Sequence, residues 1–99
     1  MTEKEFMSNQ FNYFMQLGTT GEKHIDKKII IIKEYLPKLD IEVDGGIHIE
    51  NLIDKEKGIL RNTLIAYVEI LDRKHQNNDD LFKFLQYIKN ILVIDKKLN

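Results

Sequence analysis

Residues 50–74, ENLIDKEKGILRNTLIAYVEILDRK, are the stretch of sequence that decides the fold. Their apolar residues recur at steps of seven, four, three and four, at Ile53, Leu60, Leu64, Tyr67 and Leu71. Such spacing places side chains in one stripe along an α-helix. The sequence therefore predicts that residues 50–74 form the longest helix and that this stripe faces the core.

A glycine at position 58 interrupts the predicted helix. Within a helix, glycine is about 1 kcal/mol less favourable than alanine, so Gly58 marks either a tolerated position in one helix or a turn between two. The first interpretation describes a core helix of a bundle, and the second describes a helix-turn-helix unit. We favour one continuous helix, because Asp54 and Lys57 stand where the tight turn of such a unit needs apolar side chains.

The first and last segments of the chain also carry helix signals. Residues 2–5 have the Thr-x-x-Glu spacing of a capping box. Apolar residues then continue at helical spacing, which predicts a helix over residues 3–17, ended by Gly18. Near the other end, a polar loop precedes apolar residues at steps of four, three and four, which predicts a helix over residues 79–94.

The second segment can be read in two ways. Residues 19–22 repeat the Thr-x-x-Glu spacing before another apolar stripe, and Pro37 should end a helix near Leu36. The four consecutive isoleucines at 29–32 are equally suited to a buried strand, because β-branched side chains favour strands. We favour the helix, because the apolar stripe extends beyond the isoleucine run on both sides.

Residues 41–49 alternate apolar and polar side chains around Asp44-Gly45-Gly46. This pattern is typical of a short hairpin, and an irregular connection is the other possibility. The predicted fold is mainly α: a compact bundle of about four helices with a short hairpin or irregular loop at 40–49. The alternative is an α+β fold with a small sheet from residues 28–33, 41–44 and 47–50.

Composition limits what the chain is expected to do. Its 99 residues suit a single helical domain spanning 1–99, and the 42% apolar and 31% charged content is that of a folded protein. Fifteen basic and sixteen acidic residues give a net charge of −1, which favours neither nucleic acid nor an anionic membrane. The sequence has no cysteine, no apolar run near 18 residues and no secretory signal at its charged start. We therefore expect a cytoplasmic location with no membrane contact.

Side chains that carry catalysis or hold metals are sparse. The three histidines, His24, His48 and His75, lack the spacing of a metal pair, and Ser8 has no motif of a nucleophile. Gly45-Gly46 lacks the pattern of a phosphate-binding loop. We therefore expect a protein that is not an enzyme, with no catalytic residue, metal or cofactor.

Residues 49–64 resemble the helix-turn-helix unit of bacterial regulators, with a recognition helix starting near Arg61. The resemblance implies that Arg61, Asn62 and Thr63 would face bases or phosphates. The five basic and five acidic side chains of residues 50–74 balance, so tight phosphate binding is not expected. DNA binding as a transcriptional regulator is therefore the alternative function.

The favoured function rests on surplus apolar side chains. Four helical stripes do not need eight further apolar residues, namely Phe6, Tyr13, Ile30, Ile31, Ile65, Val68, Val93 and Ile94. Surplus apolar surface indicates a homodimer seam or a groove for a partner. We expect the partner, another protein or a second copy of the chain, to contact Phe6, Tyr13, Ile30, Ile31, Lys27 and Lys33.

In general character, the chain resembles bacteriocin immunity proteins and phage-encoded inhibitors of host enzymes. The likeness lies in small size, expected helical content and the lack of catalytic motifs, and no residue motif carries it. High isoleucine, lysine and asparagine usage also hints at an AT-rich bacterial or phage genome. The resulting hypothesis is a small bacterial or phage regulator or inhibitor that acts by binding a partner protein.

Overall fold

Four helices and one short hairpin make up the computed structural model, which describes residues 2–42, 46–73 and 79–98. In chain order the elements are α1 (Glu3–Met15), α2 (Lys23–Tyr35), the 3₁₀ turn η1 (Leu36–Lys38), β1 (Asp40–Ile41), β2 (Ile47–His48), α3 (Asp54–Arg73) and α4 (Asp79–Leu98). The mainly α prediction is confirmed, including the hairpin in the region 40–49.

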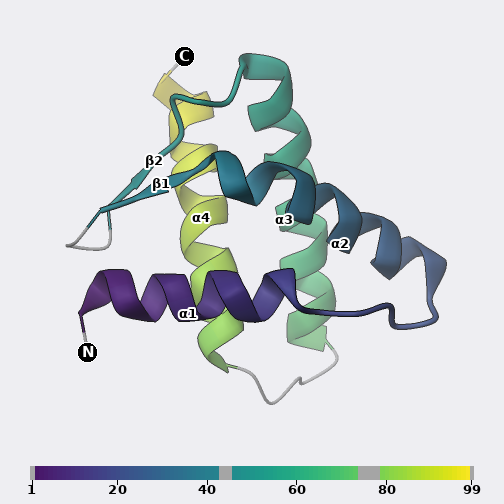
Figure 1. Ribbon diagram of the computed structural model, residues 1–99. Coiled ribbons are helices and arrows are strands. Elements are labelled where there is room, and N and C mark those ends of the chain that lie inside the picture. Colours follow the sequence, from purple (N-terminus) through teal and green to yellow (C-terminus); the bar gives the residue numbers. More distant parts are fainter. Residues whose placement is uncertain (1, 43–45, 74–78, 99) are drawn as a thin grey trace.

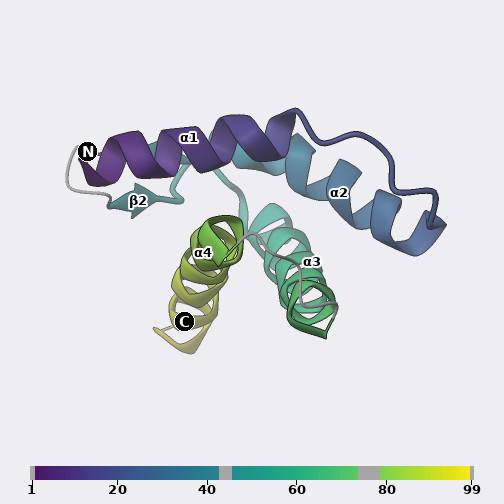
Figure 2. The same ribbon diagram turned by 90° about the horizontal axis from the view of Figure 1, so that it is seen from below.

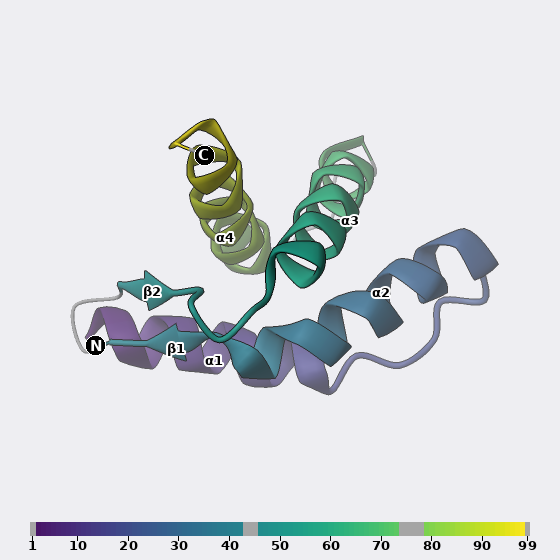
Figure 3. The same cartoon turned by 90° about the horizontal axis from the view of Figure 1, so that it is seen from above.

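The helices form two layers, as Figures 1 and 2 show, with α1 and α2 in one layer and α3 and α4 in the other. Helix α3 packs against both α2 and α4, and α1 packs against α4. Seen from above in Figure 3, the hairpin lies beside α1. This arrangement brings the ends of α1 and α3 close to the starts of α2 and α4.

The core lies between the layers and contains the predicted stripes of all four helices except Ile53. From α3 it takes Leu60, Leu64, Tyr67 and Val68, and Tyr67 meets Phe14 of α1 edge to face, with ring centroids 5.9 Å apart. Such aromatic pairs add about 0.5–1.5 kcal/mol beyond the burial of their area. Val68, which the sequence suggests as surplus surface, is therefore part of the core instead.

Helix α3 begins later than predicted, at Asp54 and not at residue 50. Its start is fixed by Glu56, whose carboxylate accepts a hydrogen bond from the Ile53 N–H (3.0 Å) and one from the Lys38 ammonium. This is the returning half of a capping box, and it satisfies an N–H that the helix leaves free. Ile53 therefore precedes the helix and is 64% exposed, so placing it in the buried stripe is wrong.

One of the two predicted capping boxes provides the N-cap of its helix, and the other does not. Thr2 caps α1, because its hydroxyl accepts a hydrogen bond from the Glu5 N–H (3.1 Å). The second prediction is wrong, since α2 begins only at Lys23. The N–H and hydroxyl of Thr20 donate instead to the Asp26 carboxylate, at 2.7 and 2.9 Å, and charge-assisted hydrogen bonds of this kind are stronger than neutral ones.

The isoleucine run is helical, and the alternative strand over residues 28–33 is wrong. Ile29 and Ile32 are buried, Ile31 is half-buried and Ile30 is 63% exposed. Pro37 follows the helix inside η1, where it needs no amide hydrogen. Helical period therefore outweighs the strand preference of four β-branched side chains, because α2 packs on α3 along that stripe.

The hairpin pairs its strands antiparallel, with Asp40 opposite His48 and Ile41 opposite Ile47. Its predicted turn, residues 44–46, lies outside the described residues except for Gly46, whose carbonyl accepts a hydrogen bond from the Glu42 N–H (2.8 Å). The His48 Nε2 lies 2.8 Å from a Glu42 carboxylate oxygen. The pKa of His48 is raised, chiefly by its hydrogen bond with Glu42 and further by the charges of Glu42 and Glu50.

Gly58 lies inside α3, which is continuous through it, so the favoured interpretation of this glycine is confirmed. The turn that a helix-turn-helix unit needs at this position is not there, and residues 49–53 before α3 are not helical. That geometric expectation is wrong, because the capping bond of Glu56 starts a single helix at Asp54. Helix α4 reaches Leu98, four residues beyond its predicted end at residue 94.

Gly58→Ala is expected to raise the free energy of unfolding by about 0.5–1 kcal/mol, because alanine favours the helix. An added Cβ would meet the Arg61 Nη2 at 3.6 Å, an ordinary contact distance. Gly21→Ala is the control: its φ of +89° strains any side chain, so a loss of about 1 kcal/mol is expected. Denaturant unfolding followed by circular dichroism measures both changes, and equal losses would contradict a continuous α3.

The pH dependence of the hairpin should follow His48. Because the folded protein raises its pKa, the contact with Glu42 stabilises the fold fully below about pH 6.5, the ordinary value, and is lost as the pH rises through the folded pKa. NMR titration of the imidazole should therefore give a pKa above about 6.5. Glu42→Gln should bring it back, and Glu50→Gln should change it less, since Glu50 lies 3.7 Å from Nδ1. An unchanged pKa in Glu42→Gln would refute this assignment.

Candidate functional site

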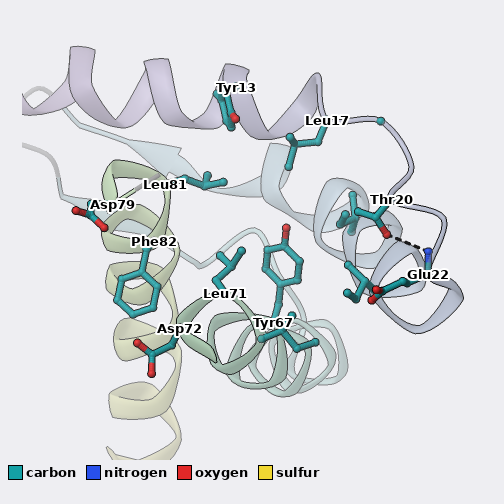
Figure 4. Close-up of a pocket in the computed structure, with 14 residues that line it drawn as sticks. Tyr13, Leu17, Thr20, Glu22, Tyr67, Leu71, Asp72, Asp79, Leu81 and Phe82 are labelled. Atoms are coloured by element: carbon teal, nitrogen blue, oxygen red, sulfur yellow. Dashed lines mark hydrogen bonds between the residues drawn. The ribbon is translucent and has the colours of Figure 1, made fainter. Parts of the chain in front are cut away.

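A cavity of about 400 Å³ opens where α1 and α3 end and α2 and α4 begin. Figure 4 shows the side chains around it, which come from all four helices and from the connection after α1. Its walls are mostly apolar and include Leu17, Ile25, Leu71, Leu81 and Phe82. A cavity of this size and character is of the kind that proteins use to bind apolar groups.

The connection between α1 and α2 shapes one side of the cavity. Leu17, Gly18 and Thr20 line it, and the two hydrogen bonds from Thr20 to Asp26 fold the connection against the first turn of α2. These bonds also lower the pKa of the Asp26 carboxyl, because they favour its charged form. At the end of α1, the Lys33 ammonium donates to the Leu17 carbonyl, which fastens this end to α2.

Tyr67 lies deepest among the polar side chains of the cavity, with only 4% of its surface exposed. Burial, and secondarily the neighbouring Tyr13, raises the pKa of its phenol. No hydrogen bond joins its hydroxyl to another described residue. Among the described residues, the buried side-chain atom without a hydrogen-bond partner is the Gln86 Oε1. Figure 4 shows Tyr67 and Tyr13 pointing toward one another across the cavity.

Negative charge surrounds the opening. Glu22, Asp72 and Asp79 line it, and none of the described lining residues is lysine, arginine or histidine. Two helices present their negative C-terminal ends here and two present their positive N-terminal ends, so the helix dipoles largely cancel. Among the described lining residues, the charged side chains are all carboxylates.

A second, smaller cavity of about 170 Å³ adjoins the first and shares Leu17, Gly18 and Ile29 with it. Ile30 and Lys33 line this smaller cavity, and Tyr13 lines the larger one. Three of the six predicted partner-binding residues thus lie around one pair of cavities. The Lys33 ammonium, however, is bound to the Leu17 carbonyl.

The other three predicted partner-binding residues line neither cavity. Phe6 is half-buried and packs against the core, Ile31 is half-buried, and Lys27 is exposed on α2. The sequence analysis did not predict Tyr67, Asp72 or Asp79 as site residues, and it placed Tyr67 in the core stripe of residues 50–74. Of these three, only Asp72 has an unusual position in the sequence pattern. A carboxylate in the last turn of a helix is unfavourable because it lies at the negative end of the helix dipole.

The three residues of the DNA-binding alternative do not form one exposed surface. Thr63 is half-buried, and its hydroxyl donates to the Ile59 carbonyl (2.8 Å) within α3. Arg61 is also half-buried, with its guanidinium close to Gly58, and Asn62 is exposed. A further set of exposed apolar side chains, Ile65, Tyr87 and Ile94, lies on α3 and α4 away from the cavities.

Within the described parts of the chain, no three histidine, cysteine, aspartate or glutamate side chains gather as a metal site would require. In the same parts, no helix combines the length and the apolar run of a membrane span. The described cavity offers apolar contacts, two phenols and three carboxylates at its lining.

Tyr67→Phe is expected to leave the free energy of unfolding unchanged or slightly higher, because no hydrogen bond joins the hydroxyl that it removes to another described residue. Removing a hydroxyl that forms a hydrogen bond would instead cost about 0.5–1.5 kcal/mol. Tyr67→Ala is the comparison and should cost about 3–5 kcal/mol, because it deletes the ring that packs on Phe14. Denaturant unfolding distinguishes these outcomes, and a loss above about 1 kcal/mol in Tyr67→Phe would mean that the hydroxyl is bonded within the fold.

Comparison of the chain with models of protein families, with curated proteins and with solved structures returned no significant match. The function is therefore inferred from the residues and their geometry.

Proposed function

We propose that the chain is a non-catalytic binding protein that recognises a partner protein through the surface around the two cavities. One observation carries this proposal: an apolar cavity of about 400 Å³ opens beside Tyr13, which is 47% exposed. Ile30, on the adjoining cavity, is 63% exposed. Exposed apolar side chains next to a concave apolar site are typical of a protein interface.

The energetics suit such an interface. Fully burying one leucine or phenylalanine side chain of a partner in the cavity would contribute about 1.5–3 kcal/mol. Tyr13 would lie at the rim, and tyrosine is among the residues that most often dominate binding energy at protein interfaces. A stable complex buries about 1,200–2,000 Å² in total, so the partner would also cover Ile30 and the neighbouring face of α2.

A protein of this kind acts by occupying a surface of its partner. That action suits the regulator or inhibitor role, bacterial or phage, that the sequence suggests. DNA binding has less support, because residues 50–74 carry balanced charge and Thr63 is bonded within its own helix. Salt-dependent binding to random duplex DNA that is lost in Arg61→Ala would favour the DNA alternative.

The proposal predicts that partner binding depends on Tyr13 and Ile30. The immobilised chain would be exposed to lysate of a candidate host, and retained proteins identified by mass spectrometry. Tyr13→Ala and Ile30→Glu should each lower retention of the same protein at least about tenfold, the loss expected for an interface residue worth above 1 kcal/mol. Light scattering on the same variants tests whether a second copy of the chain is that partner.

Matched controls come from α4. Tyr87 is 40% exposed and Ile94 is 55% exposed, close to the values of Tyr13 and Ile30, and neither lines a cavity. Tyr87→Ala and Ile94→Glu should therefore retain the partner. If no protein is retained specifically, or if only the α4 variants lose it, the proposed interface is wrong.

A further inference from the structure

A second surface, which the proposed function does not use, lies on the side of α3 and α4 that faces away from the first layer. Solvent-exposed residues, with half-buried Gly58 at one end, recur there at helical steps of four, three and four on both helices. We call this surface the outer face, and it consists of Gly58, Asn62, Ile65 and Glu69 on α3 and Lys83, Tyr87, Asn90 and Ile94 on α4. None of these residues lines either cavity.

Two observations fix the heights of α3 and α4 relative to one another. The helices run in opposite directions (Figure 1), and Lys57 of α3 lies 3.8 Å from Asp95 of α4 between their charged atoms. Nearer the other end, Leu71 and Leu81 line the same cavity. Because both helices rise equally per residue, each step along α3 matches one step back along α4. Four pairs of the outer face therefore lie at equal height: Gly58 with Ile94, Asn62 with Asn90, Ile65 with Tyr87 and Glu69 with Lys83.

The two helices present complementary side chains at equal heights. Ile65 and Tyr87 are both apolar in their larger part, and each is 40% exposed. Glu69 and Lys83 carry opposite charges, and neither forms an ion pair with another described residue. A surface whose two halves match each other in this way is also complementary to a second copy of itself, provided that the halves are exchanged.

We propose that two copies of the chain associate through the outer face, with α3 of each copy packed on α4 of the other. A twofold axis parallel to the helices produces this arrangement, because rotation about it exchanges α3 and α4 and leaves every height unchanged. Glu69 then meets Lys83 of the second copy, and the pair occurs twice. Ile94 meets Gly58 of the second copy, where the missing side chain leaves room.

The shape of the outer face suits the same rotation. Figures 2 and 3 show that α3 and α4 each begin near the first layer and end farther from it. Because the helices are antiparallel, one helix projects and the other is recessed at each end of the face. The rotation sets the projecting end of α3 onto the recessed start of α4 in the second copy, and the projecting end of α4 onto the recessed start of α3.

The size of the face allows a weak dimer. Each of the two helices has 20 residues, which corresponds to a length of about 30 Å and a width of about 10 Å. The pair of helices thus offers about 600 Å² per copy, and two copies would bury about 1,200 Å², the lower limit for specific interfaces. At one end of the face, Asp72 and Asp80 lie at equal height and carry like charges, which lowers the affinity further.

Sedimentation equilibrium of the full chain should give a dimer with a dissociation constant between about 1 µM and 1 mM. Tyr87→Ala and Ile65→Ala should each raise this constant at least about tenfold, because each residue occurs twice in the interface. The controls are Tyr13→Ala and Ile30→Ala in the first layer, at 47% and 63% exposed positions, which should leave it unchanged. Circular dichroism establishes that each variant keeps its fold.

Charge variants test the pairing of heights. Glu69→Lys and Lys83→Glu should each weaken the dimer about threefold or more, and the two together in one chain should restore it. Asp80→Asn should tighten the dimer about twofold, because it removes the like charge that faces Asp72 of the second copy. Weakening that is additive in the double charge reversal would contradict the pairing.

Cross-linking tests which helices meet. The chain has no cysteine, so Asn62→Cys and Asn90→Cys each introduce a single reactive thiol. When the two variants are mixed, one of them isotopically heavy, a short bismaleimide should join mainly one copy of each, because the rotation brings these positions together. Mass spectrometry distinguishes this product from a pair of identical variants. Asn12→Cys, exposed on α1, is the control and should give only background with either variant.

A chain that stays monomeric up to about 1 mM, cross-links mainly between identical variants, or association lost only in Tyr13→Ala and Ile30→Ala would overturn the inference. These outcomes are distinct from failure of the proposed function. A dimer that depends on Tyr87 can exist whether or not lysate proteins bind through Tyr13. Retention of a partner by Tyr87→Ala, together with loss of the dimer in the same variant, would support both surfaces.

Discussion

The edge-to-face contact between Phe14 and Tyr67 joins the two layers of the protein and defines the cavity beside it. Phe14 is fully buried in α1, and Tyr67 comes from the apolar stripe of α3, so this contact joins α1 to α3 while α1 also packs on α4. It also positions the Tyr67 hydroxyl toward the cavity. One aromatic residue thereby takes part in both the core and the candidate binding site.

The helices were predictable because their apolar residues recur at helical spacing, and these same residues are the ones that pack between the two layers. Leu60, Leu64 and Tyr67 are all buried, and so are most of the corresponding residues of the other helices. The ends of the helices were less predictable, because they depend on which of several nearby groups accepts a hydrogen bond. Asp26 outcompetes the expected Thr19 cap, and Glu56, which also accepts from Lys38, sets the start of α3.

The candidate site was predictable only in part. Tyr13 and Ile30 stood out because helical stripes do not need them, and both proved to be exposed beside cavities. Tyr67 could not stand out, since a tyrosine in a core stripe looks like any other core residue until the structure places it in the lining of the cavity. Asp72 and Asp79 belong to different helices, and the packing of α3 on α4 brings both to the lining of one cavity.

The hairpin has a consequence for how the protein behaves at high concentration. Both of its strands are sheet edges, and such edges can template pairing with another chain. Each strand is only two residues long, and Asp40, Glu42 and His48 place ionisable groups along it. Short, charged edges of this kind are a means by which proteins resist strand-to-strand aggregation. The described hairpin can therefore border the α1 layer without offering a surface on which sheets could grow.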